Sequence, residues 1–478
     1  MKRRTFLKGS LALGTGSIML QGCDSLKTNK DSASQDDTQT KSVTKPKVKL
    51  PKSANTKLNV ALIGAGGTII RAAYSTCLKE NMICMADVDD ERGAMGFEKF
   101  PKAKKYRDFR EMLDKHYKEL DAVIISTPDH THFPATYATM ERGIAVQTQK
   151  PLTHNIWQAR TLQKAAHKFK VQTVMGNQGH TYEGIRLIRE WYESGLVGEV
   201  REVHAWTNRT TINNSNAKRT PEFKAIPGTL DWDLWIGPTT VRNFSPEICP
   251  SKWRWWWDFG LGGLGDIGCH TLDIPKYAMS LDYPSVVYTK NDLHFDNNLT
   301  DNHGAKVVPK ADAATYVFEF PARGTKPPVT VFWYEGGNLP RLPESVKKLP
   351  KIQAGGCLLV GDKNTIVSPG MRPSSPRLLN DWMELRKQLP PKTIPRSLGD
   401  PIKELFAAVR GDIDRCGSNF DYAVPLTEVV ILGTIANRTG KRVEYNPQSM
   451  TFKDSSMNEF IKEPVRRGWE YGEDLLSI

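Results

Sequence analysis

The sequence lacks several features that assign many proteins to a structural or functional class at once. Its seven cysteines include no Cys-x-x-Cys pair and are scattered, which argues against a zinc site, a redox dithiol or a disulfide scaffold. After the N-terminal apolar stretch, no segment approaches the ~20 consecutive apolar residues that a membrane-spanning helix needs. The 66 lysines and arginines form no run dense enough for a nucleic-acid surface, although the net charge is +13. We therefore expect a globular protein that binds no nucleic acid.

The N-terminus resembles an export leader. Residues 1–23 contain Arg3-Arg4 followed by Phe-Leu-Lys, then a short apolar stretch that ends at Leu20. That stretch has the length of a signal-peptide core and is too short to span a membrane. The pattern is similar to a twin-arginine signal, and Leu20-Gln21-Gly22-Cys23 looks like a lipobox that makes Cys23 a candidate lipid anchor. We expect export by the twin-arginine route, to the periplasm or as a membrane-anchored lipoprotein, with simple cleavage or retention of the leader as alternatives.

Three further regions follow the leader. Residues 24–56 are rich in Ser, Thr, Lys and Asp with almost nothing apolar, which predicts a disordered linker. In residues 57–177 short apolar runs alternate with segments of helical periodicity, which predicts an α/β domain with a parallel sheet and helices on both faces. In residues 178–478 strands with period-two character dominate, which predicts an α+β domain with a large, mostly antiparallel open sheet. A helix from about Pro425 to Thr439 is expected to return toward the first domain.

The first apolar run ends in a glycine-rich turn typical of a dinucleotide-binding Rossmann domain. Gly64 permits the tight turn and Gly66 lets the backbone approach a pyrophosphate. Ile69 occupies the third glycine position, a departure that puts close packing of the next helix on the sheet in doubt. Asp87 ends the second strand, where a carboxylate accepts hydrogen bonds from a ribose diol. With Asp89 beside it, a 2′-phosphate is disfavoured, so NAD is expected rather than NADP.

Four motifs along the chain together resemble one family. They are Ser126–His132 after the fourth strand, Lys150-Pro151, Gly176–Gln178, and Gly265-Asp266 followed by His270. The sequence is similar to glucose–fructose oxidoreductase, inositol dehydrogenase and their relatives, the Gfo/Idh/MocA family, over nearly all of its length from Lys57. One departure is Gln149, which stands where the family has the Glu of its Glu-Lys-Pro motif. By family analogy alone, the open sheet is also a homo-oligomer face.

The fingerprint and the resemblance together predict a cofactor site formed by Gly64, Gly66, Gly67, Thr68, Asp87, Ser126, Thr127, Pro128, His132, Lys150, Asn177 and Gln178.

The reacting centre is expected where two of these motifs meet. Oxidation of a secondary alcohol needs a base for the hydroxyl proton and a positive charge near the developing alkoxide. The spacing places Asp266, His270 and roughly Asp273 on one face of a helix that runs from Asp266 to Met279. Taken alone, Asp266 and His270 are better explained as a helix cap and a packed histidine, and Lys150 as a residue of a solvated turn. The resemblance implies the catalytic roles: His270 as general acid/base, Lys150 as polarising cation and Asp266 as substrate anchor or orienter.

A cluster of tryptophans precedes this helix. Trp253–Trp257 contains four tryptophans and Arg254. A buried aromatic core is the usual reason for tryptophan, but so many neighbouring positions cannot all face one core, and indole faces stack well on sugar rings. No third ligand accompanies His130 and His132, so no metal site is expected. The predicted substrate residues are Lys150, His180, Arg254, Trp255, Trp256, Asp266 and His270.

Three functions fit these observations. The first is a sugar or polyol oxidoreductase whose tightly bound NAD is regenerated in its own site, because an exported protein has no soluble cofactor pool. The second is a redox-neutral glycosidase, in which NAD transiently oxidises a ring carbon, the aglycone is eliminated and the hydride returns. The third is a non-catalytic sugar-binding relative, which the presence of Lys150 and His270 disfavours.

Overall fold

The computed structural model describes residues 56–208, 222–290, 314–340 and 355–476. The predicted leader and almost all of the predicted linker therefore lie outside the described residues. No helix within the described ranges is long and apolar enough to cross a membrane. No group of three or more metal-ligating side chains occurs in the same ranges.

The first half of the described chain forms a six-stranded parallel sheet in the order β3-β2-β1-β4-β5-β6. Its strands are β1 (Asn59–Ile63), β2 (Asn81–Ala86), β3 (Lys104–Tyr106), β4 (Ala122–Ile125), β5 (Ala145–Thr148) and β6 (Thr173–Met175). The helices between them are α1 (Thr68–Cys77), α2 (Asp90–Lys99), α3 (Phe109–His116), α4 (Asp129–Glu141) and α5 (Ile156–Phe169). The strand order crosses over between β1 and β4, so the carboxyl ends of these strands leave a crevice for a ligand.

Local sequence explains why these helices begin where they do. Asp89, Asp108 and Asn155 each precede a helix and accept hydrogen bonds from backbone N–H groups of its first turn. Helices α1 and α4 have no side-chain cap, because Gly67 and Pro128 precede them. At α1 the preceding glycine also leaves open space beside the first turn. The N–H groups at that end are thus left for another partner.

The second half is built on a nine-stranded sheet in the order β13-β12-β11-β7-β10-β9-β8-β14-β15. Only the β10–β7 pair is parallel, and the other neighbours are antiparallel. The strands are β7 (Val200–Thr207), β8 (Val286–Thr289), β9 (Ala314–Phe320), β10 (Val329–Glu335), β11 (Gly355–Gly361), β12 (Thr365–Pro369), β13 (Arg377–Leu378), β14 (Val443–Asn446) and β15 (Thr451–Phe452). This confirms the predicted pairing of a Rossmann domain with an α+β domain that carries a large, mostly antiparallel sheet.

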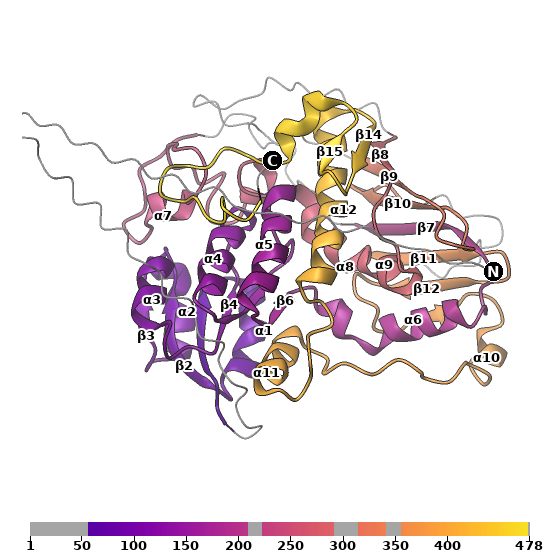
Figure 1. Cartoon of the computed structure of the whole chain (residues 1–478), viewed down its shortest axis with the longest axis horizontal. Helices are drawn as coiled ribbons and strands as arrows, with labels where there is room; N and C mark the ends of the chain where they lie inside the picture. The colour runs from indigo at the N-terminus through magenta and orange to yellow at the C-terminus, as the bar shows by residue number, and fades with distance from the viewer. Residues whose placement is uncertain (1–55, 209–221, 291–313, 341–354, 477–478) are drawn as a thin grey trace, which may run out of the picture. The chain divides into compact units, whose positions relative to one another are not determined.

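The remaining helices are α6 (Glu183–Glu193), α7 (Trp232–Ile236), α8 (Cys269–Thr271), α9 (Asp273–Met279), α10 (Trp382–Leu385), α11 (Pro401–Arg410) and α12 (Phe420–Thr439). Helix α12 packs against α5 on one side and β8 on the other, so it lies between the two sheets (Figure 1). It begins at Phe420, five residues before the expected start, because Asn419 caps it and Pro425 is accommodated inside. Helix α11 returns to the first sheet and packs on β4, β5 and β6.

One segment forms a small apolar cluster of its own. We call residues 229–260 the cap segment; its core includes Trp232, Trp235 and Trp256. Two backbone hydrogen bonds join the segment to the loop after β2, from Asp231 N to Val88 O (2.8 Å) and from Asp90 N to Thr229 O (3.0 Å). The cap segment is thus fastened directly beside the carboxyl ends of the Rossmann strands.

Candidate functional site

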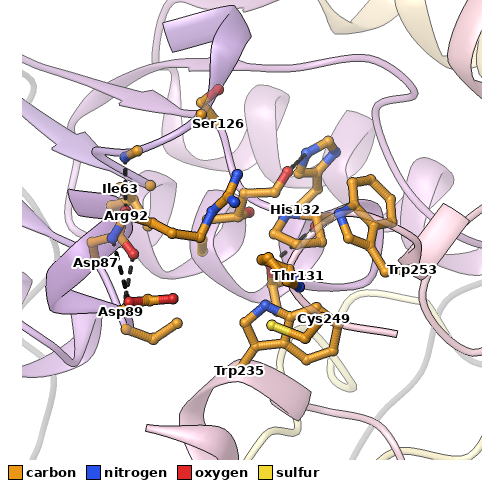
Figure 2. A pocket seen from close by; sticks show the side chains of 18 of the residues that line it. Ile63, Asp87, Asp89, Arg92, Ser126, Thr131, His132, Trp235, Cys249 and Trp253 are labelled. Carbon is orange, nitrogen blue, oxygen red and sulfur yellow. Dashed lines mark hydrogen bonds between the residues drawn. The ribbon is translucent and has the colours of Figure 1, made fainter. Parts of the chain in front are cut away.

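A cavity of about 290 Å³ lies between the carboxyl ends of the Rossmann strands and the cap segment. Figure 2 shows Trp235, Cys249 and Trp253 of the cap segment across from Asp87 and Arg92. The predicted residues that line this cavity are Gly64, Gly66, Gly67, Asp87, Ser126, Thr127, Pro128, His132, Lys150 and Arg254. The side chains of Thr68 and Trp255 lie outside the described residues.

The glycine turn has a shape that suits a pyrophosphate. Gly64 has φ 84°, and a Cβ there would lie 2.6 Å from the Ser126 carbonyl oxygen, so no larger residue fits. Gly67 has φ 96°, and a Cβ there would meet no atom within 4 Å. Because Gly67 lines the cavity at the uncapped start of α1, a Cβ would occupy the space that the turn leaves for a ligand. Open space beside free N–H groups is what a bound phosphate requires, so these residues fit a dinucleotide.

Asp87 lines the cavity and also shapes the glycine turn. One carboxylate oxygen accepts a hydrogen bond from Gly66 N (2.8 Å) and the other from Asp89 N (3.1 Å). Burial raises the pKa of Asp87, while these backbone donors oppose that rise. The Asp87 carboxylate therefore links the part of the cavity where a ribose would bind to the glycine turn that would hold the pyrophosphate.

Lys150 occupies the opposite end of the cavity and is only 3% exposed. Its ammonium group donates to the backbone carbonyl of Asp266 and to Asp266 Oδ1 (2.9 Å). Arg254 Nε lies 3.4 Å from the same carboxylate oxygen. Asp266 belongs to a π-helical turn, Leu264–Gly268, and such turns widen a helix and occur often at functional sites. The structure thus joins two predicted catalytic residues that lie 116 positions apart in the sequence.

A second carboxylate stands beside this pair. Asp129, the first residue of α4, is 1% exposed and lines the cavity. Burial raises its pKa, and the nearby charges of Arg254, His132 and Lys150 oppose that rise. An aspartate oxygen buried so close to two cations balances their charge, which lowers the cost of keeping them out of water.

His132 holds two loops together at the cofactor cavity. Its ring nitrogens lie 2.7 Å from the Pro151 carbonyl oxygen and 2.9 Å from the Thr127 carbonyl oxygen. Burial lowers its pKa. These contacts tie the loop after β4 to the segment that carries Lys150.

The expected single helix from Asp266 to Met279 is wrong. The chain forms the π-helical turn, then α8 and α9 as separate pieces. His270 lies in α8, four residues after Asp266, and is 3% exposed. Asp273 does not join the Lys150–Asp266 pair, because the change of helical pitch turns it toward a different cluster.

That cluster contains two of the predicted site residues. Asn177 Nδ2 donates to Asp273 (3.0 Å), His180 Nδ1 lies 3.2 Å from the same carboxylate, and the Tyr422 hydroxyl also donates to it. All four side chains are buried or nearly so, and none of them lines the cofactor cavity. Gln178 accepts a hydrogen bond from Arg372 (3.1 Å) and lines an adjoining cavity.

The tryptophan run divides between cavity and core. Trp253 lines the cofactor cavity, and the Arg254 guanidinium lies 4.1 Å from its ring centroid. Trp256 is buried in the cap segment, where its Nε1 donates to the Glu247 carbonyl (3.0 Å). Trp256 is therefore a packed core aromatic, whereas Trp253 faces the cavity.

Two family models match the chain. Residues 58–177 match the NAD-binding Rossmann fold of the GFO_IDH_MocA oxidoreductase family, and residues 185–305 match the C-terminal alpha/beta domain of the same family. The chain belongs to the Gfo/Idh/MocA family. Its Rossmann domain is therefore of the NAD-binding kind, in agreement with the turn at Gly64 and with Asp87.

Curated members of the family match over part of their length. Levoglucosan dehydrogenase of Pseudarthrobacter phenanthrenivorans is 22% identical over 46% of this chain and 51% of the relative. The rhizopine catabolism protein MocA of Rhizobium meliloti is 27% identical over 41% of this chain and 62% of the relative. The chain thus spans between 30% and 62% of the length of the curated relatives named in this article.

Solved structures share the fold over more of the chain. An inositol dehydrogenase homologue of Azotobacter vinelandii, complexed with NADH and myo-inositol, superposes with a TM-score of 0.54 at 16% identity, covering 83% of this chain and 99% of its own. The WlbA dehydrogenase of Chromobacterium violaceum, complexed with NADH and UDP-GlcNAcA, gives a TM-score of 0.58 at 16% identity, covering 84% and 99%. At this identity the likeness concerns the fold.

Several residues of the family site were not among the residues predicted from the sequence. Asp129 could have been predicted from the sequence, because it lies inside the motif after the fourth strand and carries a charge close to His132. Gln149 and Trp253 belong to motifs that the sequence analysis names, but nothing local indicated that they face the cavity. Trp235 and Cys249 face it through the docking of the cap segment, which is distant in the sequence. The cavity-lining residues missed in this way are Arg92, Arg107, Asp129, Gln149, Trp235, Cys249 and Trp253.

Proposed function

We propose that the protein oxidises a secondary hydroxyl of a sugar, polyol or glycoside with an NAD that stays bound between turnovers. The observation that carries this proposal is the buried Lys150–Asp266 pair at one end of a cavity whose other end is built for a dinucleotide. The family relatives named as levoglucosan, D-xylose and inositol dehydrogenases support the substrate class.

We assign a separate chemical role to each residue at the reacting end of the cavity. NAD, when bound, supplies the acceptor for the electrons of the C–H bond. Lys150 presents a fixed ammonium donor that stabilises negative charge on the substrate oxygen as the proton leaves. Asp266 accepts a hydrogen bond from that ammonium, Asp129 places a second carboxylate near it, and Asp266 together with Arg254 orients substrate hydroxyls. We assign His270, buried in α8 four residues after Asp266, as the acceptor of the hydroxyl proton, the role that the family resemblance implies.

The cap segment supports cofactor retention. It is joined by backbone hydrogen bonds to the loop that carries Asp87 and Asp89, and it places Trp235 and Trp253 over the cavity. These contacts hold the cap segment against the cavity and would slow the loss of a bound dinucleotide. An enzyme that keeps its cofactor must reoxidise the reduced nicotinamide in the same site. It does so by passing the hydride to the carbonyl of a second substrate before the next cycle.

We extend the proposal to location and assembly. The twin-arginine pattern at Arg3-Arg4 supports export of the folded protein with its cofactor, and the lipobox-like sequence supports anchoring at Cys23. Replacing Cys23 with Ala is expected to move the protein from the membrane to the soluble periplasmic fraction. The nine-stranded sheet offers a face for a homo-oligomer, which light scattering of the mature protein would detect as a multiple of the chain mass.

One experiment tests the chemistry. The mature protein is purified, its absorbance is examined for copurified NAD, and sugars, polyols and aryl glycosides are offered without added cofactor. Reduced-nicotinamide absorbance that appears with a free sugar supports the oxidoreductase. Release of the aglycone without lasting reduction would assign the redox-neutral glycosidase instead, and protein that is cofactor-free and needs millimolar NAD would contradict retention.

A further inference from the structure

A second cavity, of about 300 Å³, lies behind the cap segment. Its walls come from the start of α5, the end of α12, the cap segment and the C-terminal segment around Phe460 and Glu463. It shares no lining residue with the cofactor cavity. Nothing in the proposed oxidation uses it.

The feature that sets this cavity apart is Arg438, in the last turn of α12. The residue is 8% exposed, and its guanidinium lies 4.0 Å from the ring centroid of Trp257 and 5.3 Å from that of Phe460. Within the described ranges it makes no hydrogen bond and no ion pair, and its Nη1 is fully enclosed. Burial lowers the pKa of Arg438 to about 10. A buried guanidinium without an acceptor is costly, so this side chain is held ready for a partner.

The other buried charges around the cavity already have partners. Arg242 forms an ion pair with Asp258, and His154 Nδ1 lies 2.7 Å from Glu463 Oε2. Glu459 is exposed at the rim. Among the described residues Arg438 has no ion pair and no hydrogen bond, although the charges of Glu463, Asp258 and Glu459 act on it. A cavity that already holds these carboxylates favours a ligand with a single negative charge, placed directly on the guanidinium. A phosphate, at about −2 near neutral pH, would meet the surrounding carboxylates with its second charge.

We propose that this cavity binds an acidic monosaccharide, with its carboxylate on Arg438. The planar guanidinium matches a carboxylate in a two-point geometry, here through Nε and Nη2, since Nη1 is enclosed. Gln158, Thr239 and Thr240 line the same cavity and supply the mixed donors and acceptors that ring hydroxyls need. The volume is at the lower end of the ~300–1,000 Å³ typical of small-molecule sites, which is more room than a simple carboxylate such as acetate fills.

The test is a binding measurement that needs no turnover. Calorimetric titration of the NAD-loaded protein compares D-glucuronate and D-galacturonate with D-glucose, acetate and the neutral methyl ester of glucuronate. At least one uronate is expected to bind at least tenfold more tightly than its neutral counterparts, as the loss of a charge-assisted hydrogen bond predicts. Acetate that binds as tightly as both uronates would overturn the sugar part of the proposal, and equal binding of the ester and the acid would overturn the role of the charge.

Variants locate the site. Arg438→Met is expected to weaken uronate binding by roughly tenfold to a hundredfold. Arg442→Met is the matched control, because Arg442 is exposed and pairs with Glu319, and it should bind as the parent does. Undiminished uronate binding by a folded Arg438→Met protein would overturn the assignment; the ester comparison decides the question if that variant fails to fold. Since only binding is measured, failure here would leave the proposed oxidation untouched.

Discussion

Replacing Lys150 with Met tests the reacting centre most directly. The ammonium is the buried donor at the cavity end and holds Asp266 in place. Methionine keeps much of the aliphatic volume, so the change removes a charge and two hydrogen bonds with little loss of packing. Loss of one preorganised electrostatic donor typically lowers kcat by about 10²–10³-fold, or ~3–4 kcal/mol of transition-state stabilisation.

The stability cost should be smaller than the catalytic one. Asp266 keeps Arg254 at 3.4 Å, and its side chain is 18% exposed. The aspartate is therefore not left as an isolated buried charge, and the expected destabilisation is that of lost hydrogen bonds to charged groups, on the order of 1–3 kcal/mol.

The assay reads reduced-nicotinamide absorbance in single turnovers with the best substrate of a sugar and polyol panel. Copurified NAD and the thermal midpoint of the variant are measured alongside. The control is Lys102→Met, which removes an exposed lysine elsewhere in the Rossmann domain. A folded, NAD-loaded Lys150→Met protein whose rate stays within about threefold of the parent would refute the role given to this residue.

Three further predictions follow from the same geometry. Asp129→Asn should lower the rate about tenfold at unchanged NAD content, because a neutral amide no longer balances the charges of Arg254 and Lys150; an unchanged rate constant would contradict this. Gly67→Ala combines a strained positive φ with a Cβ in the ligand space, so copurified NAD per chain should fall several-fold. The protein should stay folded, with its free energy of unfolding lowered by about 1 kcal/mol. The His154–Glu463 pair should shape the pH dependence of stability. Burial opposes the charged form of each group, but Glu463 with Asp129 and Asp258 raises the pKa of His154, and His154 with Asn155 and Arg438 lowers the pKa of Glu463. The contribution of His154 to the free energy of unfolding is complete below its ordinary pKa of ~6.5 and is lost as pH rises through its raised pKa. The contribution of Glu463 is complete above ~4.5 and is lost as pH falls through its lowered pKa. Chemical denaturation at a series of pH values should therefore show the largest contribution of this pair to the free energy of unfolding between these limits. Glu463→Gln should flatten the plot of unfolding free energy against pH in that range.

The NAD-binding half was readable from sequence because its signals are local. The turn at Gly64, the acidic residue at Asp87 and the alternation of strands and helices each lie within one supersecondary unit. Backbone conformation and cofactor contact are set there by neighbours in the chain. The helix after Gly265 was harder, because the 3.6-residue period that placed Asp273 beside Asp266 fails across a π-helical turn.

The amino-acid sequence by itself determined the two-domain order and the dinucleotide turn, and it offered Lys150, Asp266 and His270 as candidates for the chemistry. Only the tertiary structure decided which groups meet. It joined Lys150 to Asp266, moved Asn177 and His180 into a buried cluster with Asp273, and selected Trp253 over Trp256 to face the cavity. The reason is physical. Periodicity says which side of an element is apolar, but the direction that a polar or aromatic side chain takes depends on what packs against it from distant parts of the chain.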